Sequence, residues 1–169
     1  MAEITLTHEF ETTPEIFWEK MFFDETWNKR FYLEVLKFPG WRLDWERTEG
    51  SLRKRRVHID PPLTNLPGAI KRVIGDRFSY AEDGSFDAAA NNYDFVVTPS
   101  TLPEKTKSRG HVRLQKVGDN KIIRTTYLSC EVKVMMVGGM VEEKILTDFR
   151  QSTESAAAFT RETLRSLGQ

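Results

Sequence analysis

Several features that mark common classes of protein are missing from this chain. It has one cysteine, Cys130, which excludes an internal disulfide and favours a reducing compartment. No apolar run approaches the roughly 20 residues needed to span a bilayer, and the first residues lack the basic and apolar segments of a signal peptide. We therefore expect a soluble, cytoplasmic protein.

Strong charge and catalytic motifs are missing as well. The formal net charge is zero, with 25 basic and 25 acidic residues, so no overall field favours nucleic acid. The chain has no Gly-x-Ser-x-Gly motif, no His-Glu-x-x-His motif, no Cys-x-x-Cys pair and no glycine-rich phosphate or dinucleotide loop. His8, His58 and His111 are far apart in the sequence, which gives no support to a metal site. We expect no metal, no cofactor and no nucleic-acid partner, and the sequence identifies no catalytic residue.

What is present is a pattern of many strands followed by one long helix. Alternation over residues 3–11 predicts a first strand, and Pro14 and Asp24 mark the starts of two short helices. Apolar residues near a 3.6 period, from Val141 to Leu167, predict the final helix. Six further strands are predicted, over residues 41–46, 52–59, 76–87, 92–98, 105–117 and 121–134.

This order of elements predicts an α+β helix-grip fold, in which a seven-stranded curved antiparallel sheet wraps around a long C-terminal helix. At 169 residues we expect one domain, spanning residues 1–169.

Short stretches along nearly the whole chain carry a family resemblance. They include Thr7-His8-Glu9-Phe10, Phe17-Trp18, Tyr32-Leu33-Glu34, Gly75-Asp76-Arg77-Phe78-Ser79-Tyr80, Thr98-Pro99-Ser100-Thr101-Leu102 and Ser155-Ala156-Ala157-Ala158-Phe159-Thr160. With them the chain resembles the START-like (SRPBCC, Bet v 1-like) superfamily, and within it an uncharacterised bacterial START-like family. The resemblance implies an internal cavity for a lipid, a sterol, a polyketide or another apolar molecule, and some members of the superfamily are cyclases or hydrolases.

A curved sheet that faces one helix leaves space that side chains need not fill. Small residues in the middle of the final helix, such as Ser152 and Ala156, would enlarge that space, although close packing of helix on sheet explains them equally well. The candidate ligand-binding residues are His8, Trp45, Arg55, Ile59, Phe78, Tyr93, Phe95, Tyr127, Glu131, Phe149, Ser152, Ala156 and Phe159.

Polar residues on the predicted inner face need partners. Arg55 alternates in phase with Val57 and Ile59, so it is buried if that face lines the cavity. A buried arginine requires an acidic partner, with Glu82 and Glu131 as candidates, or an anionic group on the ligand. The alternative is a solvated strand edge. His8 is either a hydrogen-bonded core histidine or a polar handle in the pocket.

A short amphipathic segment interrupts the strands. Leu66, Ile70, Val73 and Ile74 recur at helical spacing within residues 63–75 and predict a lid over the cavity. Lys71 and Arg72 in the same segment would allow transient contact with a membrane surface, and an ordinary connecting helix is the simpler alternative.

The leading functional hypothesis is a carrier or sensor that binds a hydrophobic small molecule. Burial of apolar surface would contribute ~25 cal/mol per Å². The first alternative is an enzyme of the cyclase, dehydratase or hydrolase type, with His8, Glu131 and Tyr127 as acid–base candidates. The second is a protein-interaction module that uses the mouth of the cavity.

Overall fold

The strands form one continuous antiparallel sheet in the order β1-β7-β6-β5-β4-β3-β2. The computed structural model describes residues 1–168. Its strands are β1 (Ala2–Phe10), β2 (Gly40–Glu49), β3 (Leu52–Asp60), β4 (Tyr80–Asp87), β5 (Asn92–Pro99), β6 (Thr106–Gly118) and β7 (Lys121–Val132). Strands β2 to β7 pair with their neighbours in the chain, and β1 pairs with β7 at the other edge of the sheet. The predicted seven-stranded α+β helix-grip arrangement is confirmed.

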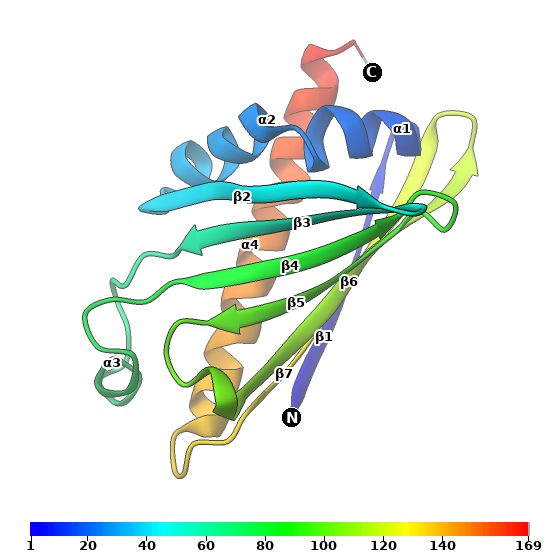
Figure 1. Ribbon diagram of the computed structural model, residues 1–169. Helices are drawn as coiled ribbons and strands as arrows, with labels where there is room; N and C mark the ends of the chain where they lie inside the picture. Colours follow the sequence, from blue (N-terminus) through cyan, green and yellow to red (C-terminus); the bar gives the residue numbers. More distant parts are fainter. Residues whose placement is uncertain (169) are drawn as a thin grey trace.

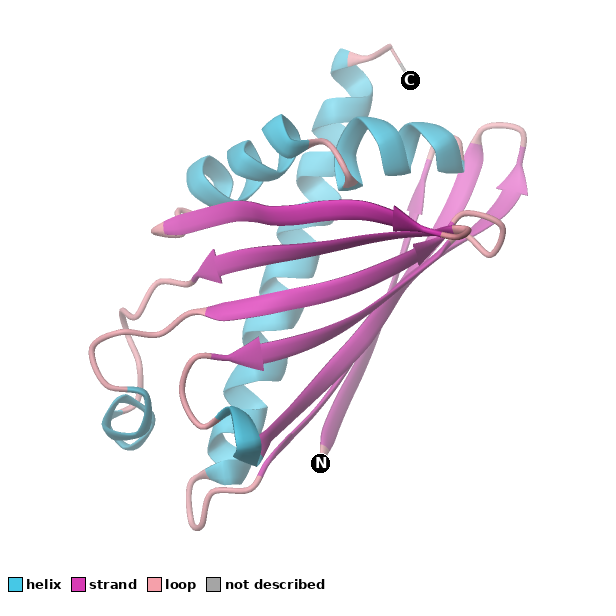
Figure 2. Cartoon of the chain, in the orientation of Figure 1, coloured by secondary structure: helices cyan, strands magenta, loops and turns pink. Residues whose placement is uncertain are grey.

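The long helix α4 (Gly138–Ser166) crosses the concave face of this sheet (Figure 1). It lies behind the strands in Figure 2, and its contacts with the sheet are concentrated on β1 and β7. No helix within residues 1–168 is long and apolar enough to cross a membrane.

Two short helices separate β1 from β2, as predicted. Each continues into π-helical turns, so that α1 (Pro14–Phe17) runs into η1 (Trp18–Phe22) and α2 (Glu25–Lys29) runs into η2 (Arg30–Val35). The Thr13 hydroxyl accepts a hydrogen bond from the Ile16 amide, and the Asp24 carboxylate accepts one from the Trp27 amide, which caps both helices. They lie along the β2 edge of the sheet and cover one end of its concave face (Figure 1).

Several boundaries differ from the predicted ones. Strand β4 begins at Tyr80, so residues 76–79 belong to the preceding loop. The lid segment is helical only over α3 (Gly68–Ile74), because Pro67 lacks an N–H and Gly75, at a φ of 72°, ends the helix. A short turn of 3-10 helix, η3 (Pro103–Lys105), also separates β5 from β6.

A bulge in β2 changes which side chains of that strand face inward. The register with β3 shifts between Leu43 and Trp45, so Leu43 opposes Val57 on the inner face whereas Trp45 opposes Arg56 on the outer one. A shift of one residue reverses the face of every side chain beyond it. The simple alternation assumed over residues 41–46 was therefore wrong at Trp45.

The core lies between the concave face, the N-terminal helices and α4. Its larger cluster contains Phe17, Trp18, Met21, Phe86 and Tyr93, with further side chains from β6, β7 and α4. A smaller cluster of Trp41, Val57 and Ile59 lies under β2 and β3.

Two glycines on the inner face make room for aromatic side chains. A Cβ atom at Gly84 would overlap the Tyr93 ring and hydroxyl, and one at Gly110 would meet Phe95 and the Tyr127 carbonyl. Since no side chain fits there, Tyr93 and Phe95 can lie across the neighbouring strands close to the backbone.

Candidate functional site

A buried polar cluster lies on the inner face of β3, β4 and β5; we call it the Arg55 cluster, and it consists of Arg55, Tyr93 and Glu82. Arg55 Nε donates to Tyr93 Oη at 3.2 Å, and Tyr93 Oη donates to Glu82 Oε2 at 2.8 Å. Arg55 Nη2 lies 3.9 Å from the same carboxylate oxygen. The tyrosine hydroxyl thus bridges a guanidinium and a carboxylate inside the fold.

Aromatic rings and a main-chain carbonyl surround the guanidinium. Arg55 Nη1 donates to the Phe22 carbonyl at 3.1 Å, and the centroids of the Phe22, Phe23 and Tyr93 rings lie 4.7, 5.1 and 5.2 Å from Arg55 Cζ. Cation–π contacts of this kind stabilise a guanidinium that has lost its water. Arg55 is only 6% exposed.

The ionisation of this cluster follows from its burial. Burial raises the pKa of the Glu82 carboxyl, although Arg55 and the Tyr93 hydrogen bond oppose this shift. Burial also raises the pKa of Tyr93, so its hydroxyl stays protonated. Burial lowers the pKa of Arg55, but Tyr93 and Glu82 raise it by more, and the net direction is upward. Arg55 is therefore charged, and Glu82 holds its proton more readily than an ordinary glutamate.

Two further tyrosines extend the polar region along the same face. Tyr80 occupies the inner face of β4 two residues before Glu82, and Tyr32 comes from η2. Burial is the largest cause that raises the pKa of each, and the charge of Glu82 adds to it in both cases. The negative charge of Asp148 on α4 adds to the rise in the pKa of Tyr80, although the Asp148 side chain is 53% exposed.

The apolar side chains around this region are incompletely covered. Val97 on β5 and Ile145, Leu146 and Phe149 on α4 pack against the core but remain partly exposed. A few polar groups among apolar walls is the composition expected of a small-molecule site.

A second polar cluster, the Arg124 cluster, lies under α4 and consists of Arg124, His8 and Glu154. Arg124 Nη2 lies 3.1 Å from His8 Nδ1, and His8 Nε2 lies 3.0 Å from Glu154 Oε2. Because a guanidinium only donates, Nδ1 accepts and Nε2 donates to the carboxylate. The prediction that His8 lies on the inner face and is hydrogen-bonded agrees with this geometry.

Arg124 is less completely partnered than Arg55. Its Nη2 also donates to the Thr153 carbonyl at 3.3 Å, but its buried Nε has no hydrogen-bond partner among the described residues. Burial lowers the pKa of Arg124 to about 10.

Some residues predicted to line the cavity lie on the inner side of the fold. Arg55, Tyr93 and Phe95 are buried there as neighbours, and Glu82 rather than Glu131 is the acidic partner of Arg55. His8, Ile59 and Phe149 lie elsewhere on that side, and Ser152 and Ala156 are half-buried on α4, three and seven residues after Phe149. Phe159 packs away from the sheet, against Trp27 and Phe31 of the N-terminal helices, with ring centroids 4.9 and 6.0 Å apart.

Other predicted residues do not face the concave side. Tyr127 and Glu131 are in phase with Ser129 on the outer face of β7, where Tyr127 stacks on His111 and donates to Glu3. Trp45 is on the same outer face because of the β2 bulge. Phe78 is half-buried in the loop before β4, with its ring centroid 6.5 Å from that of Tyr80, and its role in the site stays a prediction. The expectation that Tyr127, Glu131 and Trp45 line the concave space was wrong.

The residues predicted to form a lid differ in how far they are buried. Ile70 is buried, whereas Leu66, Val73 and Ile74 are partly exposed. Helix α3 lies beyond the ends of β3 and β4 (Figure 1), so it flanks the concave face and does not cover its centre.

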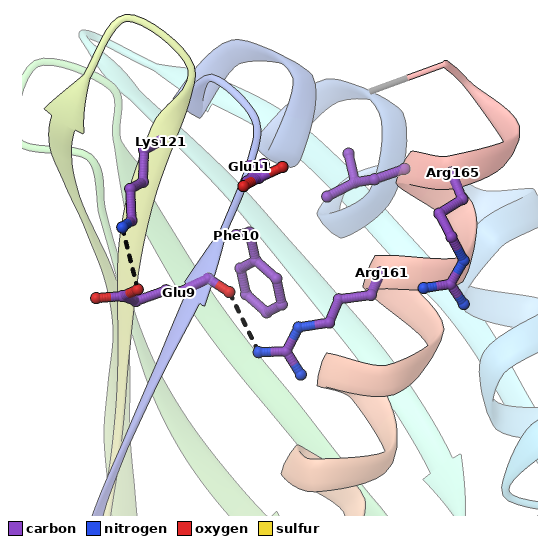
Figure 3. Close-up of a pocket in the computed structure, with 7 residues that line it drawn as sticks. Glu9, Phe10, Glu11, Lys121, Arg161 and Arg165 are labelled. Carbon is purple, nitrogen blue, oxygen red and sulfur yellow. Dashed lines mark hydrogen bonds and ion pairs between the residues drawn. The ribbon is translucent and has the colours of Figure 1, made fainter.

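Two open depressions occur elsewhere on the surface. One, of about 720 Å³, lies on the outer face and includes Trp45, His111 and Tyr127. The other, of about 400 Å³, lies where β1 ends beside α4. Figure 3 shows it with the Arg161 guanidinium donating to the Glu9 carbonyl and Lys121 paired with the Glu9 carboxylate. Both depressions carry charges of both signs, and the Arg55 cluster borders neither.

Metal and thiol chemistry find little support in the geometry. Within residues 1–168 no three histidine, cysteine, aspartate or glutamate side chains gather into a potential metal site. Burial raises the pKa of the Cys130 thiol to about 11, so it remains protonated and is a poor nucleophile.

Sequence reasoning missed Tyr32, Asp148, Arg124 and Glu154. Alternation in β7 could have identified Arg124, since it is in phase with the buried Ile122, Thr126 and Leu128. No local signal marks Tyr32 or Asp148, because their positions depend on how η2 and α4 pack.

The fold is shared with several solved structures of low sequence identity. A START superfamily protein from Mycobacterium smegmatis matches with a TM-score of 0.62 and 14% identity, over 96% of this chain and 98% of that one. The Zhui aromatase/cyclase from a Streptomyces species matches with a TM-score of 0.61 and 10% identity, over 98% and 95%. Norcoclaurine synthase from Thalictrum flavum matches with a TM-score of 0.63 and 11% identity, over 94% and 86%.

These similarities confirm the START-like, Bet v 1-like fold that the sequence suggested. No match was found among curated proteins. A family model matches residues 5–164, nearly the whole chain. The chain therefore belongs to the family described as Protein of unknown function (DUF2505).

Proposed function

We propose that this protein is a carrier or sensor that binds a hydrophobic small molecule, such as a lipid, a sterol or a polyketide-like compound, between the concave face of the sheet and α4. The observation that carries the proposal is the Arg55 cluster, a fixed polar group beside partly exposed apolar side chains. Removal of a ligand's apolar surface from water would supply the affinity, at ~25 cal/mol per Å², and the polar group would orient it.

The small residues of α4 are consistent with this proposal. Thr153 and Ala157 are buried and allow close approach of the helix to the sheet, whereas Ser152 and Ala156 remain partly exposed. We therefore propose that the ligand-binding space lies beside the face of α4 that carries Ser152 and Ala156.

Transient membrane contact is part of the same proposal. The loop between β7 and α4 carries Met135 and Met136, which are 90% and 95% exposed. It lies at the same end of the molecule as α3 in Figure 1, and Lys71 and Arg72 of α3 are exposed. Apolar and basic side chains at one end suit a weak, reversible contact with an anionic bilayer.

A second candidate function is acid–base catalysis on the bound molecule. The observation that favours it is the Glu82 carboxyl, whose pKa is raised by burial and which accepts a hydrogen bond from the Tyr93 hydroxyl. Glu82 replaces Glu131 and Tyr127 as the candidate, because those two lie on the outer face.

The binding proposal is tested by comparing native and denaturing mass spectra of gently purified protein, with extraction of anything released, and by titrating tryptophan fluorescence with lipids and sterols. We expect a released apolar molecule or a saturable fluorescence change. An apo mass together with no response to the whole panel would refute the carrier or sensor role and favour a protein-interaction module.

A matched pair of variants locates the binding region. Ala156→Phe should reduce affinity by at least about tenfold, since it fills the proposed space, and Ala158→Phe, on the exposed side of α4, should leave affinity unchanged. Equal effects of the two variants would contradict this location.

A further inference from the structure

We infer that the molecule bound at the Arg55 cluster presents a neutral or cationic hydrogen-bond donor, such as a hydroxyl or an amine, and not a carboxylate or phosphate. The inference rests on the proposed function and names the chemical class of its ligand. It follows from which groups of the cluster are already occupied and which remain accessible.

The hydrogen-bond donors of Arg55 are largely occupied by groups of the protein, so few remain for an anion. Its Nε and Nη1 already donate to Tyr93 Oη and the Phe22 carbonyl, and its Nη2 faces Glu82. The rings of Phe22, Phe23 and Tyr93 surround the guanidinium. The buried positive charge is thus neutralised from within the protein, and no ligand anion is needed to stabilise it.

The accessible member of the cluster is the acceptor. The Glu82 side chain is 17% exposed, compared with 7% for the Arg55 side chain. Tyr93 occupies Oε2 of Glu82, and no hydrogen bond from residues 1–168 reaches its Oε1. A ligand that enters from the concave side therefore meets a carboxylate oxygen that lacks a donor.

The groups near Glu82 reinforce this preference. The Tyr32 and Tyr80 hydroxyls form no hydrogen bond with other residues of the described chain, and each can donate or accept. On α4, the charge of Asp148 also acts on Tyr80, and the half-exposed Asp148 carboxylate is paired with Lys144 at 2.7 Å. The described residues of this region thus offer acceptors and hydroxyls, and its two cations, Arg55 and Lys144, each have a carboxylate partner.

Hydrogen-bond donors and anions would bind at this position with different affinity. A hydroxyl or ammonium group donates to Glu82 Oε1 and accepts from, or lies beside, a tyrosine hydroxyl. A carboxylate would place a like charge beside Glu82 in a poorly solvated region, where repulsion is weakly screened. The arrangement therefore selects against free fatty acids, although an acyl chain suits the apolar walls.

Matched single-chain ligands test the inference on the purified full-length protein. Dodecanol, dodecylamine and dodecanoate, each below its aggregation concentration at pH 7, are titrated against the tryptophan fluorescence and against displacement of the neutral dye Nile red. We expect the alcohol or the amine to bind at least about tenfold more tightly than the carboxylate. Dodecanoate that binds as tightly as dodecanol would overturn the inference and leave the proposed function standing.

Variants assign the selectivity to Glu82. Glu82→Gln should reduce the affinity for dodecylamine by at least about tenfold, because the variant removes the negative charge. The ratio of the affinities for dodecylamine and dodecanoate should fall accordingly. Glu162→Gln, at an exposed position near the end of α4, is the matched control and should change nothing. If Glu82→Gln does not fold, Tyr80→Phe serves as the second variant. It should reduce the affinity for dodecanol more than the affinity for dodecanoate.

The remaining outcomes are also decisive. Selectivity that is unchanged in a folded Glu82→Gln protein, or in Tyr80→Phe, would overturn the inference. If none of the three chains and no dye binds, the proposed function itself fails and the inference fails with it.

Discussion

The two buried arginines of the inner face each contact a bridging side chain that in turn binds a glutamate. They differ in how many of their donor groups have a partner. In the Arg55 cluster a tyrosine bridges the guanidinium to a glutamate, and in the Arg124 cluster a histidine does so. Arg55 also has the carboxylate within 3.9 Å, whereas no ion pair between Arg124 and a carboxylate occurs in the described chain.

The difference is visible in the direction of the pKa shifts. Burial lowers the pKa of both guanidinium groups, but the partners of Arg55 reverse the shift and those of Arg124 do not. The positive charge of Arg161 adds to the lowering at Arg124. The two arginines are almost equally buried, at 6% and 5% exposure, so partners and not depth decide whether a buried charge is well accommodated.

The largest effect is expected from breaking the better-partnered cluster. Arg55→Leu leaves the Glu82 carboxylate without a counter-charge and removes the donor to Tyr93, so we expect a loss of about 3–5 kcal/mol in the free energy of unfolding. Urea denaturation followed by tryptophan fluorescence measures it. The double variant Arg55→Leu, Glu82→Leu should recover most of the loss, and a loss under about 1 kcal/mol in the single variant would contradict the comparison.

An intermediate effect, specific to pH, is expected from Glu82→Gln. The pKa of Glu82 is raised above its ordinary value of 4.5, so the folded protein binds this proton more tightly than the unfolded chain does. The resulting stabilisation is complete below pH 4.5 and is lost as the pH rises through the raised pKa of the folded state.

The free energy of unfolding of the natural protein should therefore fall relative to that of Glu82→Gln as the pH rises through this window. Denaturation series at several pH values measure the difference between the two proteins. A difference that is constant with pH, or that grows in favour of the natural protein, would contradict the shift assigned to Glu82.

The smallest effect is expected at the less well partnered arginine. Arg124→Met removes a charge whose Nε has no partner, so the loss of its two hydrogen bonds is largely offset and we expect a change within about 1 kcal/mol. The same denaturation assay measures it. A loss as large as that of Arg55→Leu would show that the two clusters are equivalent, contrary to their contacts.

The fold was predictable to a large extent because alternation and helical period are local properties. Period two placed His8, Tyr93 and Phe95 on the inner face, and all three are buried. It left Arg55 either buried or at a solvated strand edge, and the structure shows it buried. The same rule failed at Trp45, where a bulge moves the strand out of phase, and a bulge has no clear signature in this sequence. Tyr127 and Glu131 were assigned to the wrong face of β7, although the buried Leu128 and Cys130 indicate the correct one.

The partners of the polar residues were less predictable. The sequence left Arg55 either at a solvated strand edge or buried, and for a buried Arg55 it left Glu82, Glu131 and a ligand anion as alternative partners. Glu82 is the partner because Gly84, the next residue in phase on β4, lets Tyr93 cross from β5 to meet both groups.

By itself, the sequence determined the order of the elements, the phase of most strands, the final helix and the rule that Arg55, if buried, needs a partner for its charge. These follow from side-chain periodicity and from the cost of burying charge, which act along the chain. Only the tertiary structure decided which carboxylate meets Arg55, that Tyr32 is buried where the charge of Glu82 raises its pKa, and that Glu82 stays accessible. Those contacts join residues that are distant in sequence, and they depend on strand register, sheet curvature and the packing of η2 and α4.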